Sequence, residues 1–151
     1  MTVIVMRGIP GSGKTTLIRK RWPGAVVVSA DDHFVGRDGV YRFDPKQLGE
    51  AHAECLRRFT SVVSLKGVLV PVTLVVDNTG VSVAEVAPYV ALALAYRHEA
   101  RVVTLRCDPE VAHERNVHGV PRHACDRMAE LLDSEGGAFP LWWTHEVLEA
   151  E

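Results

Sequence analysis

Cysteine is scarce in this chain: three of the 151 residues are cysteine, and no two of them lie at a short spacing. A sparse, odd set indicates reduced thiols in a cytosolic protein rather than a disulfide framework. The stretch 113–127 brings three histidines close to Cys125, but their spacing matches no familiar zinc pattern. We therefore expect neither disulfides nor a zinc site.

Long hydrophobic runs are also missing. No apolar run approaches the roughly 18 residues of a membrane helix. The first run, VIVM, ends at Arg7 and is too short for a signal peptide. There is no internal repeat and no low-complexity linker. We expect a cytoplasmic protein without a membrane segment, formed by a single domain over residues 1–151.

Charge of either sign is not in large excess, since the net charge is −2. This excludes a molecule that attracts nucleic acid over its whole surface, so any nucleic-acid site must be a local basic patch. Arginine outnumbers lysine 13 to 4. Arginine is suited to forked phosphate contacts, although a GC-rich genome produces the same bias. Hydrophobic residues make up 47% of the chain, which is close to the globular average.

Apolar strand patterns and helical patterns alternate along the chain. The predicted strands are 2–7, 25–30, 69–76 and 100–107. The predicted helices are 14–21, 44–67, 82–97, 108–117 and 122–135, the fourth of them short. Pro88 should kink its helix or mark a later start. Residues 33–43 are expected to form a loop or small hairpin, and 136–151 have no clear pattern.

This alternation predicts an α/β fold of three layers, with parallel strands and right-handed crossovers. Ligands bind such sheets at the carboxyl ends of the strands. A glycine-rich loop follows the first predicted strand, Asp31 and Asp32 follow the second, and Asp77 follows the third. The polar residues of three strand ends should therefore meet at one edge of the sheet.

The glycine-rich loop, GIPGSGKTT, fits the pattern G-x-x-x-x-G-K-[ST] through Gly8, Gly13, Lys14 and Thr15. Its backbone N–H groups and the following helix N-terminus favour phosphate oxygens. Lys14 should reach the β- and γ-phosphates of ATP or GTP, and the Thr15 hydroxyl should hold Mg²⁺. The spacing differs from the dinucleotide pattern, which argues against a nicotinamide cofactor. The predicted nucleotide-binding residues are Gly8, Pro10, Gly11, Ser12, Gly13, Lys14, Thr15 and Thr16.

Phosphoryl transfer needs positioning, charge neutralisation and a base for the acceptor hydroxyl. Asp77 is the candidate for a carboxylate that supports the metal together with Thr15, although it could instead cap the following turn. Asp31 and Asp32 are candidates for a base beside an acceptor hydroxyl. The alternative for this pair is an ordinary turn with one solvated charge.

The stretch 113–127, HERNVHGVPRHACDR, combines arginines with a glycine–proline break between two helices. It could form a lid that closes positive charge from Arg115, Arg122 and Arg127 over the phosphates and excludes water. The alternative is a solvated helical hairpin.

Four segments, RGIPGSGKTT, SADDHF, VVDNT and ERNVHGVP followed by RM, occur in this order. Together they resemble the P-loop kinases of the polynucleotide 5′-hydroxyl kinase group. Within that group, the chain is similar over residues 3–134 to the small kinase domain (AAA_33-type) found in NEDD4-binding proteins and their bacterial and phage relatives. The resemblance implies a five-stranded sheet, with the order 2-3-1-4-5, and a helical lid.

The resemblance also implies catalytic roles. Asp31 would be the general base for a 5′-OH, Lys14 would contact the donor phosphates, and Arg115 and Arg122 would be the lid arginines. The chain departs from phage-type enzymes at two positions, because Phe34 and His118 stand where those enzymes have arginine. The predicted acceptor-binding residues are Asp32, Phe34, Arg37 and Arg42, within a groove that could also include Arg7, Arg57 and Arg58.

The sequence therefore predicts an ATP- and Mg²⁺-dependent kinase whose acceptor is the 5′-OH of RNA or DNA. A kinase of a small metabolite is the first alternative, favoured by Phe34 and by the acidic net charge. A nucleotide-dependent switch or accessory ATPase is the second. Trp142 and Trp143 could stack on a nucleobase or anchor the last segment by packing.

Overall fold

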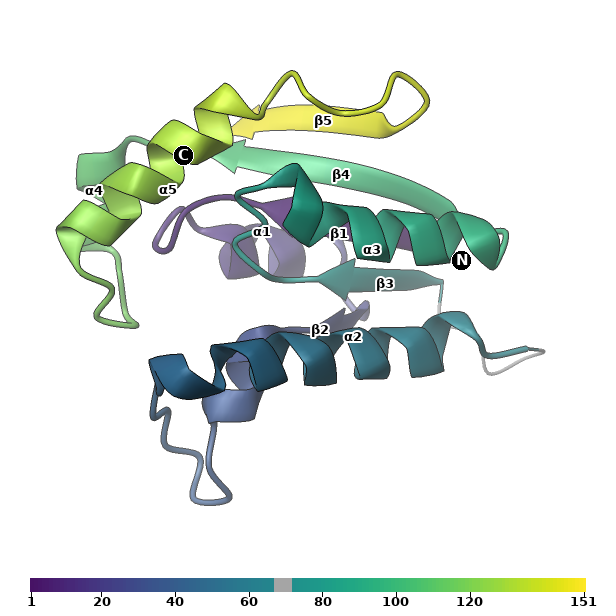
Figure 1. Cartoon of the computed structure of the whole chain (residues 1–151), viewed down its shortest axis with the longest axis horizontal. Helices are drawn as coiled ribbons and strands as arrows, with labels where there is room; N and C mark the ends of the chain where they lie inside the picture. Colours follow the sequence, from purple (N-terminus) through teal and green to yellow (C-terminus); the bar gives the residue numbers. More distant parts are fainter. Residues whose placement is uncertain (67–71) are drawn as a thin grey trace.

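The computed structural model describes residues 1–66 and 72–151. Its centre is a five-stranded sheet with the order β2-β3-β1-β4-β5 (Figure 1). All neighbouring strands pair in parallel. The strands are β1 (Thr2–Arg7), β2 (Val26–Val28), β3 (Thr73–Val76), β4 (Glu99–Arg106) and β5 (Thr144–Glu149). The predicted fold class and strand order are confirmed.

Helices cover both faces of this sheet, as the three-layer prediction requires. In Figure 1, α1 lies behind the sheet, whereas α2 and α3 lie in front of it. The α-helices are α1 (Lys14–Arg21), α2 (Leu48–Val63), α3 (Val83–Ala95), α4 (Pro109–Glu114) and α5 (Arg122–Ser134). Two short 3₁₀ helices, η1 (Ala30–Phe34) and η2 (Pro45–Gln47), precede α2.

The two faces of β1 bury different clusters, because successive side chains of a strand point to opposite faces. Val3 and Val5 belong to the larger cluster, where Phe59 of α2 meets Tyr89 of α3 edge to face at 5.0 Å. Ile4 belongs to the smaller cluster, under α1. Burial on both faces explains the continuous apolar run at the start of the chain.

The resemblance implied a fifth strand, but the residue pattern did not predict the position of β5. Its sequence, THEVLE, is mostly polar and its residues are exposed or half-buried, as suits a strand at the sheet edge. Pairing with β4 over Arg101–Arg106 makes it a strand, and this partner is distant in sequence. Trp143, just before β5, packs its ring 5.5 Å from that of Phe139.

Several predicted boundaries differ from the structure. α3 begins before Pro88 and contains it, so of the two alternatives for Pro88, a kink or a later helix start, the later start is wrong. Pro88 has no N–H to donate to the carbonyl of Ala84. Ala84 is exposed, so water can donate to this carbonyl instead. The short helix predicted to reach Val117 ends at Glu114. The predicted helix end at Gly67 and strand start at 69–71 lie outside the described residues.

The hairpin predicted around Asp38 and Gly39 is present in reduced form. Val35 and Tyr41 form an isolated antiparallel bridge, and η1 occupies the residues just before it. All three cysteines are free. Among residues 1–66 and 72–151, no helix combines the length and apolar character needed to cross a bilayer.

Candidate nucleotide-binding and phosphotransfer site

The glycine-rich loop connects β1 to α1 at the carboxyl edge of the sheet. The Gly8 N–H donates to the carbonyl of Thr79 (2.8 Å), which ties the start of the loop to the segment after β3. Lys14 Nζ donates to the carbonyls of Gly8 (2.9 Å) and Ile9 (3.1 Å), so the ammonium group lies over the loop. Burial lowers the pKa of Lys14, whereas the charges of nearby Asp77 and Asp31 raise it.

The N-terminus of α1 suits an anion. Gly13 is its N-cap residue, with φ +93°, a left-handed conformation that glycine adopts without strain. Within the described residues, no side chain caps this end and no acidic residue lies in the first turn. The N–H groups of the first turn therefore remain for phosphate oxygens.

The loop has a buried hydroxyl that can bind a ligand and a close contact with α4. The Ser12 hydroxyl is buried without a hydrogen-bond partner among the described residues, which is rare for a buried polar group unless a ligand or water satisfies it. At Gly11, an added Cβ would lie only 1.9 Å from the carbonyl oxygen of Ala112. The loop is therefore packed directly against α4 at a place where only glycine fits.

Thr15 and Asp77 are brought together as the sequence predicts for a metal-supporting pair. The Thr15 hydroxyl donates to Asp77 Oδ2 at 2.7 Å. Burial raises the pKa of the Asp77 carboxyl, whereas the hydrogen bond from Thr15 and the charge of Lys14 lower it. No cluster of three or more His, Cys, Asp or Glu side chains in the described part of the chain could hold a metal by itself. A hydroxyl and one carboxylate fit Mg²⁺, which is usually held by few protein ligands together with substrate phosphates.

Asp31 reaches the same edge of the sheet because β2 and β3 are joined beyond their last paired residues. Ser29 Oγ donates to the carbonyl of Asp77 (2.8 Å) and accepts from the N–H of Asp31 (3.2 Å), which starts η1. The N–H of Ala30 donates to the side-chain oxygen of Asn78 (2.9 Å). The exposed Asp31 carboxylate therefore lies near enough to Asp77 for its charge to raise the pKa of that half-buried group.

The rest of η1 is attached to α2. Asp32 pairs with Arg58 (2.7 Å), and His33 lies between Glu54 (Nδ1 to Oε2, 2.7 Å) and Gln47 (3.1 Å). The hydrogen bonds to these two residues raise the pKa of His33. η1 is thus held at both ends, with Asp31 on its first turn.

Phe34 was predicted to contact an acceptor, and this prediction is wrong for the conformation described. Its side chain is 5% exposed and belongs to the larger core cluster. Its ring meets those of Phe43 (5.0 Å) and Tyr41 (6.0 Å) edge to face. An aromatic ring gains more from burial than from exposure at a polar edge, so Phe34 anchors η1.

Arg7 is also not an acceptor residue, because its side chain is fully buried. Its guanidinium donates to the carbonyls of Gly80 (2.7 Å) and Val81 (2.8 Å) and to the Thr104 hydroxyl (3.4 Å), and it lies 4.7 Å from the ring centroid of Phe139. Burial lowers its pKa. Arg7 therefore supports the strand that carries the glycine-rich loop.

The exposed arginines of the predicted groove are mostly paired within the protein. Arg42 pairs with Asp38 (2.7 Å) and Arg57 with Glu50 (2.6 Å), in addition to the pair of Arg58 described above. Of the four groove arginines that are exposed or half-buried, Arg37 is the one without an ion pair among the described residues. The positive field on this side is consequently weaker than the count of arginines suggests.

The predicted lid begins beside the glycine-rich loop, where Gly11 lies against the backbone of Ala112 and Asn116. Asn116 shapes the turn after α4, because its side chain donates to the Val120 carbonyl (2.9 Å) and accepts from the His118 N–H (3.1 Å). The two arginines assigned catalytic roles bind other groups in this conformation: Arg115 donates to the Glu151 carbonyl (3.0 Å), and Arg122 pairs with Glu110 (2.9 Å). Their contact with a nucleotide stays a prediction.

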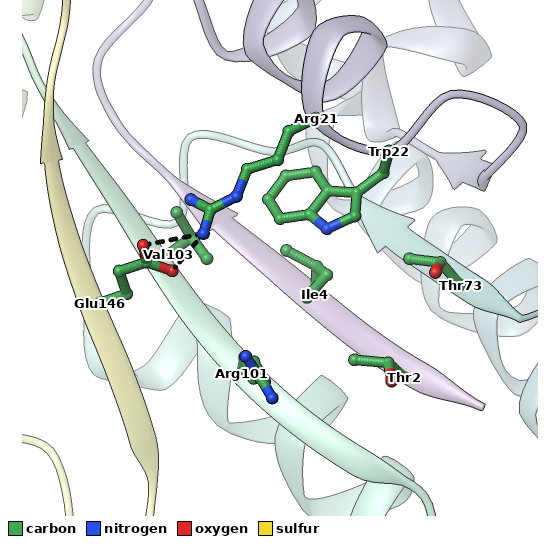
Figure 2. A pocket seen from close by; sticks show the side chains of 8 residues that line it. All are labelled: Thr2, Ile4, Arg21, Trp22, Thr73, Arg101, Val103 and Glu146. Carbon is green, nitrogen blue, oxygen red and sulfur yellow. Dashed lines mark hydrogen bonds and ion pairs between the residues drawn. The ribbon is translucent and has the colours of Figure 1, made fainter.

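A hollow of about 220 Å³ lies at the opposite, amino end of the strands, under the end of α1 (Figure 2). Figure 2 shows Arg21 reaching Glu146 of β5 (2.9 Å) beside the indole of Trp22. Trp142 is 78% exposed and also lies near the amino end of β4, beside Glu99. These side chains are thus far along the sheet from the glycine-rich loop.

Three residues of the site had no predicted role. Ser29 and Asn78 stand inside the quoted motifs, and their polar side chains next to strand ends were the available signal. Tyr41 gave no signal, because its contact with Asp31 depends on the path of the loop between them (hydroxyl to Oδ1, 3.2 Å).

Comparison with known proteins identifies the family and the fold of the chain. A human protein, NEDD4-binding protein 2, is 35% identical over 139 residues, which is 86% of this chain but 8% of the relative. Among solved structures, one chain of the Pnkp1/Rnl/Hen1 RNA repair complex has a TM-score of 0.71 at 15% identity, with coverage of 92% of this chain and 46% of that one. A gluconokinase from Sinorhizobium meliloti 1021 has a TM-score of 0.55 at 15% identity, with coverage of 99% and 82%.

At such identities the solved structures establish a shared fold. The sequence profile of the AAA domain family, AAA_33, matches residues 3–131, which include the glycine-rich loop, Asp31, Asp77 and the predicted lid. The chain therefore belongs to this AAA domain family, and its fold is that of a P-loop kinase.

Proposed function

We propose that the chain transfers the γ-phosphoryl group of ATP, with Mg²⁺, to a hydroxyl, and that the acceptor is the 5′-OH of RNA or DNA. The observation that carries the proposal is the contact of Thr15 with Asp77 (2.7 Å) at the end of a phosphate-binding loop, with a second, exposed carboxylate at Asp31. A simple nucleotide switch has no need of the second carboxylate.

The roles follow from position. Lys14 and the N–H groups at the start of α1 bind the donor phosphates, and Thr15 with Asp77 holds the metal. Mg²⁺ held by these two residues would neutralise charge on the transferring group. Asp31 accepts the proton of the acceptor hydroxyl as the hydroxyl oxygen bonds to the γ-phosphorus and the bond from that phosphorus to the leaving ADP breaks. The segment 113–127 closes over the donor with Arg115 and Arg122, which must first leave their present partners.

The proposal of a nucleic-acid acceptor is supported by the proteins to which the chain is related. The profile match and the human relative belong to the group that the sequence motifs resemble, and one structural neighbour is part of an RNA repair complex. Arg37 supplies an exposed positive charge on the loop after Asp31, and Arg42 can be released from Asp38 because both side chains of that pair are exposed.

A small-molecule acceptor is the second candidate, and the ion pairs favour it. Arg42, Arg57 and Arg58 are each neutralised by a carboxylate of the chain. A polyanion would have to compete with these carboxylates, whereas a small neutral alcohol would not. The structural similarity to a gluconokinase is consistent with this alternative.

The test is transfer of label from γ-labelled ATP, in the presence of Mg²⁺, to 5′-OH DNA, 5′-OH RNA, nucleosides or small sugars. Label at an oligonucleotide 5′ end, lost in Asp31→Asn with ATP affinity retained, supports the proposal. Glu130→Gln is the matched control, because it removes an exposed carboxylate of α5, outside the stretch 113–127, that has no hydrogen bond or ion pair among the described residues. Lys14→Ala should weaken ATP binding and transfer together.

The salt dependence separates the two acceptors. Oligonucleotide binding should weaken steeply between low and physiological salt, whereas binding of a neutral small molecule should barely change. Label on small molecules alone would support the second candidate, a small-molecule acceptor, instead of the first. ATP hydrolysis without a labelled acceptor, unchanged in Asp31→Asn, would contradict both and favour a switch or accessory ATPase.

A further inference from the structure

Tyr41 connects the candidate base to the core and to the predicted lid. Its hydroxyl donates to Asp31 Oδ1 at 3.2 Å. Its ring lies edge to face with buried Phe34, with centroids 6.0 Å apart, and packs against the His118 ring of the lid turn at 4.7 Å. One side chain thus contacts three parts of the site that are separate in the sequence.

The backbone holds Tyr41 in this place. The Val35–Tyr41 bridge, together with the hydrogen bond from the Arg42 N–H to the Phe34 carbonyl (2.8 Å), folds the loop back onto η1, which carries Asp31. The Asp38–Arg42 ion pair closes the loop across its turn. The distance between the Tyr41 hydroxyl and Asp31 is therefore set by a short, cross-linked hairpin rather than by a free side chain.

The Tyr41 hydroxyl can act as a permanent donor. Burial, and then the charge and hydrogen bond of Asp31, raise the pKa of Tyr41 to about 12. The hydroxyl thus keeps its proton near neutral pH. In the described part of the chain, Tyr41 is the one side chain that donates a hydrogen bond to the Asp31 carboxylate, so Oδ2 remains for an acceptor hydroxyl.

We infer that Tyr41 is a positioning residue, which fixes the Asp31 carboxylate through Oδ1 so that Oδ2 faces the acceptor hydroxyl. The inference rests on the proposed function, in which Asp31 takes the acceptor proton. A carboxylate free to rotate about its χ angles spends part of its time out of line with the proton, and the hydrogen bond removes that freedom. The packing of His118 against the Tyr41 ring holds the hydroxyl from the lid side.

Tyr41→Phe tests the inference, because it keeps the ring contacts with Phe34 and His118 and removes only the hydroxyl. We expect kcat for phosphoryl transfer to fall about tenfold, a part of the 10²–10⁴-fold that a well-placed base supplies. KM for ATP should change by less than about twofold and the melting temperature by less than about 2 °C, since the ring packing is retained. Tyr96→Phe, at the exposed end of α3, is the matched control and should match the unmodified chain.

A second measurement separates positioning from a structural role. In the Asp31→Glu background, where the carboxylate is displaced by one methylene, Tyr41→Phe should lower kcat by less than about twofold, because residues that act as a unit are non-additive. An equal tenfold loss in both backgrounds would mean that Tyr41 acts independently of Asp31 and would overturn the inference. A lower melting temperature with weaker ATP binding would also overturn it.

Failure of the inference and failure of the proposed function give different results. If Asp31→Asn abolishes transfer while Tyr41→Phe retains the full kcat, the base assignment stands and the inference falls. If Asp31→Asn retains transfer, or if the unmodified chain labels no acceptor, the proposed function falls and the inference falls with it.

Discussion

Replacing Arg7 by methionine should destabilise the fold by about 3 kcal/mol, since hydrogen bonds from a charged group contribute about 1.5–3 kcal/mol each. The structure contains two short bonds of this kind, to the carbonyls of Gly80 (2.7 Å) and Val81 (2.8 Å), and a longer one to Thr104. The gross loss is therefore about 3–6 kcal/mol. Removal of a buried charge recovers part of it, because burial disfavours the guanidinium, as its lowered pKa indicates.

The assay is thermal unfolding followed by circular dichroism. For a chain of this size, about 3 kcal/mol corresponds to a fall in melting temperature of about 6–12 °C. Arg57→Met is the matched control: the Arg57–Glu50 side chains are 63% and 60% exposed, and its loss should change stability by less than about 1 kcal/mol. If Arg7→Met melted within about 2 °C of the unmodified chain and instead weakened oligonucleotide binding, Arg7 would be an acceptor residue and the structural reasoning would be refuted.

Three further predictions concern the loop, the metal and pH. Gly11→Ala should destabilise the fold, and abolish ATP binding with it, because the added Cβ would overlap the Ala112 carbonyl. Gly13→Ala meets no atom within 4 Å but has a positive φ, so it should lower the free energy of unfolding by only about 1–2 kcal/mol. Equal unfolding midpoints of the two variants in denaturant would contradict this. Thr15→Ala should raise the Mg²⁺ concentration for half-maximal transfer about tenfold, and an unchanged Mg²⁺ titration would remove Thr15 from the metal site. Burial, and then the charges of Arg7 and Arg106, lower the pKa of His145 in the folded chain. The unfolded chain therefore binds more protons at this residue than the folded chain does. The free energy of unfolding should fall as the pH drops through about 6.5, the ordinary pKa of histidine, toward the folded pKa. His145→Gln should flatten that part of the curve of melting temperature against pH, and an unchanged slope would count against it.

Local sequence determined the parts of the site that depend on neighbours in the chain. The glycine-rich loop and α1 match their predicted bounds, because the left-handed glycines and the helix start are encoded within a few residues. Ser82 caps α3 through the N–H of Glu85, as the capping pattern predicts. The meeting of Asp77 with Thr15 also followed from sequence, since parallel strands that end in polar residues bring those residues to one edge.

Tertiary structure decided which side chains face inward and which strands find partners. β5 is a strand because β4 pairs with it, and its own polar sequence gives no period strong enough to predict this. Arg7 and Phe34 resemble ligand-binding residues by type and position, yet both are buried. Arg7 is buried by contacts with Gly80 and Val81, which are distant in sequence. Phe34 is buried by the loop that folds back onto it. The Tyr41–Asp31 contact depends on the path of one hairpin. Such contacts combine residues across the chain, and only the packed fold determines which of them lie within hydrogen-bond distance.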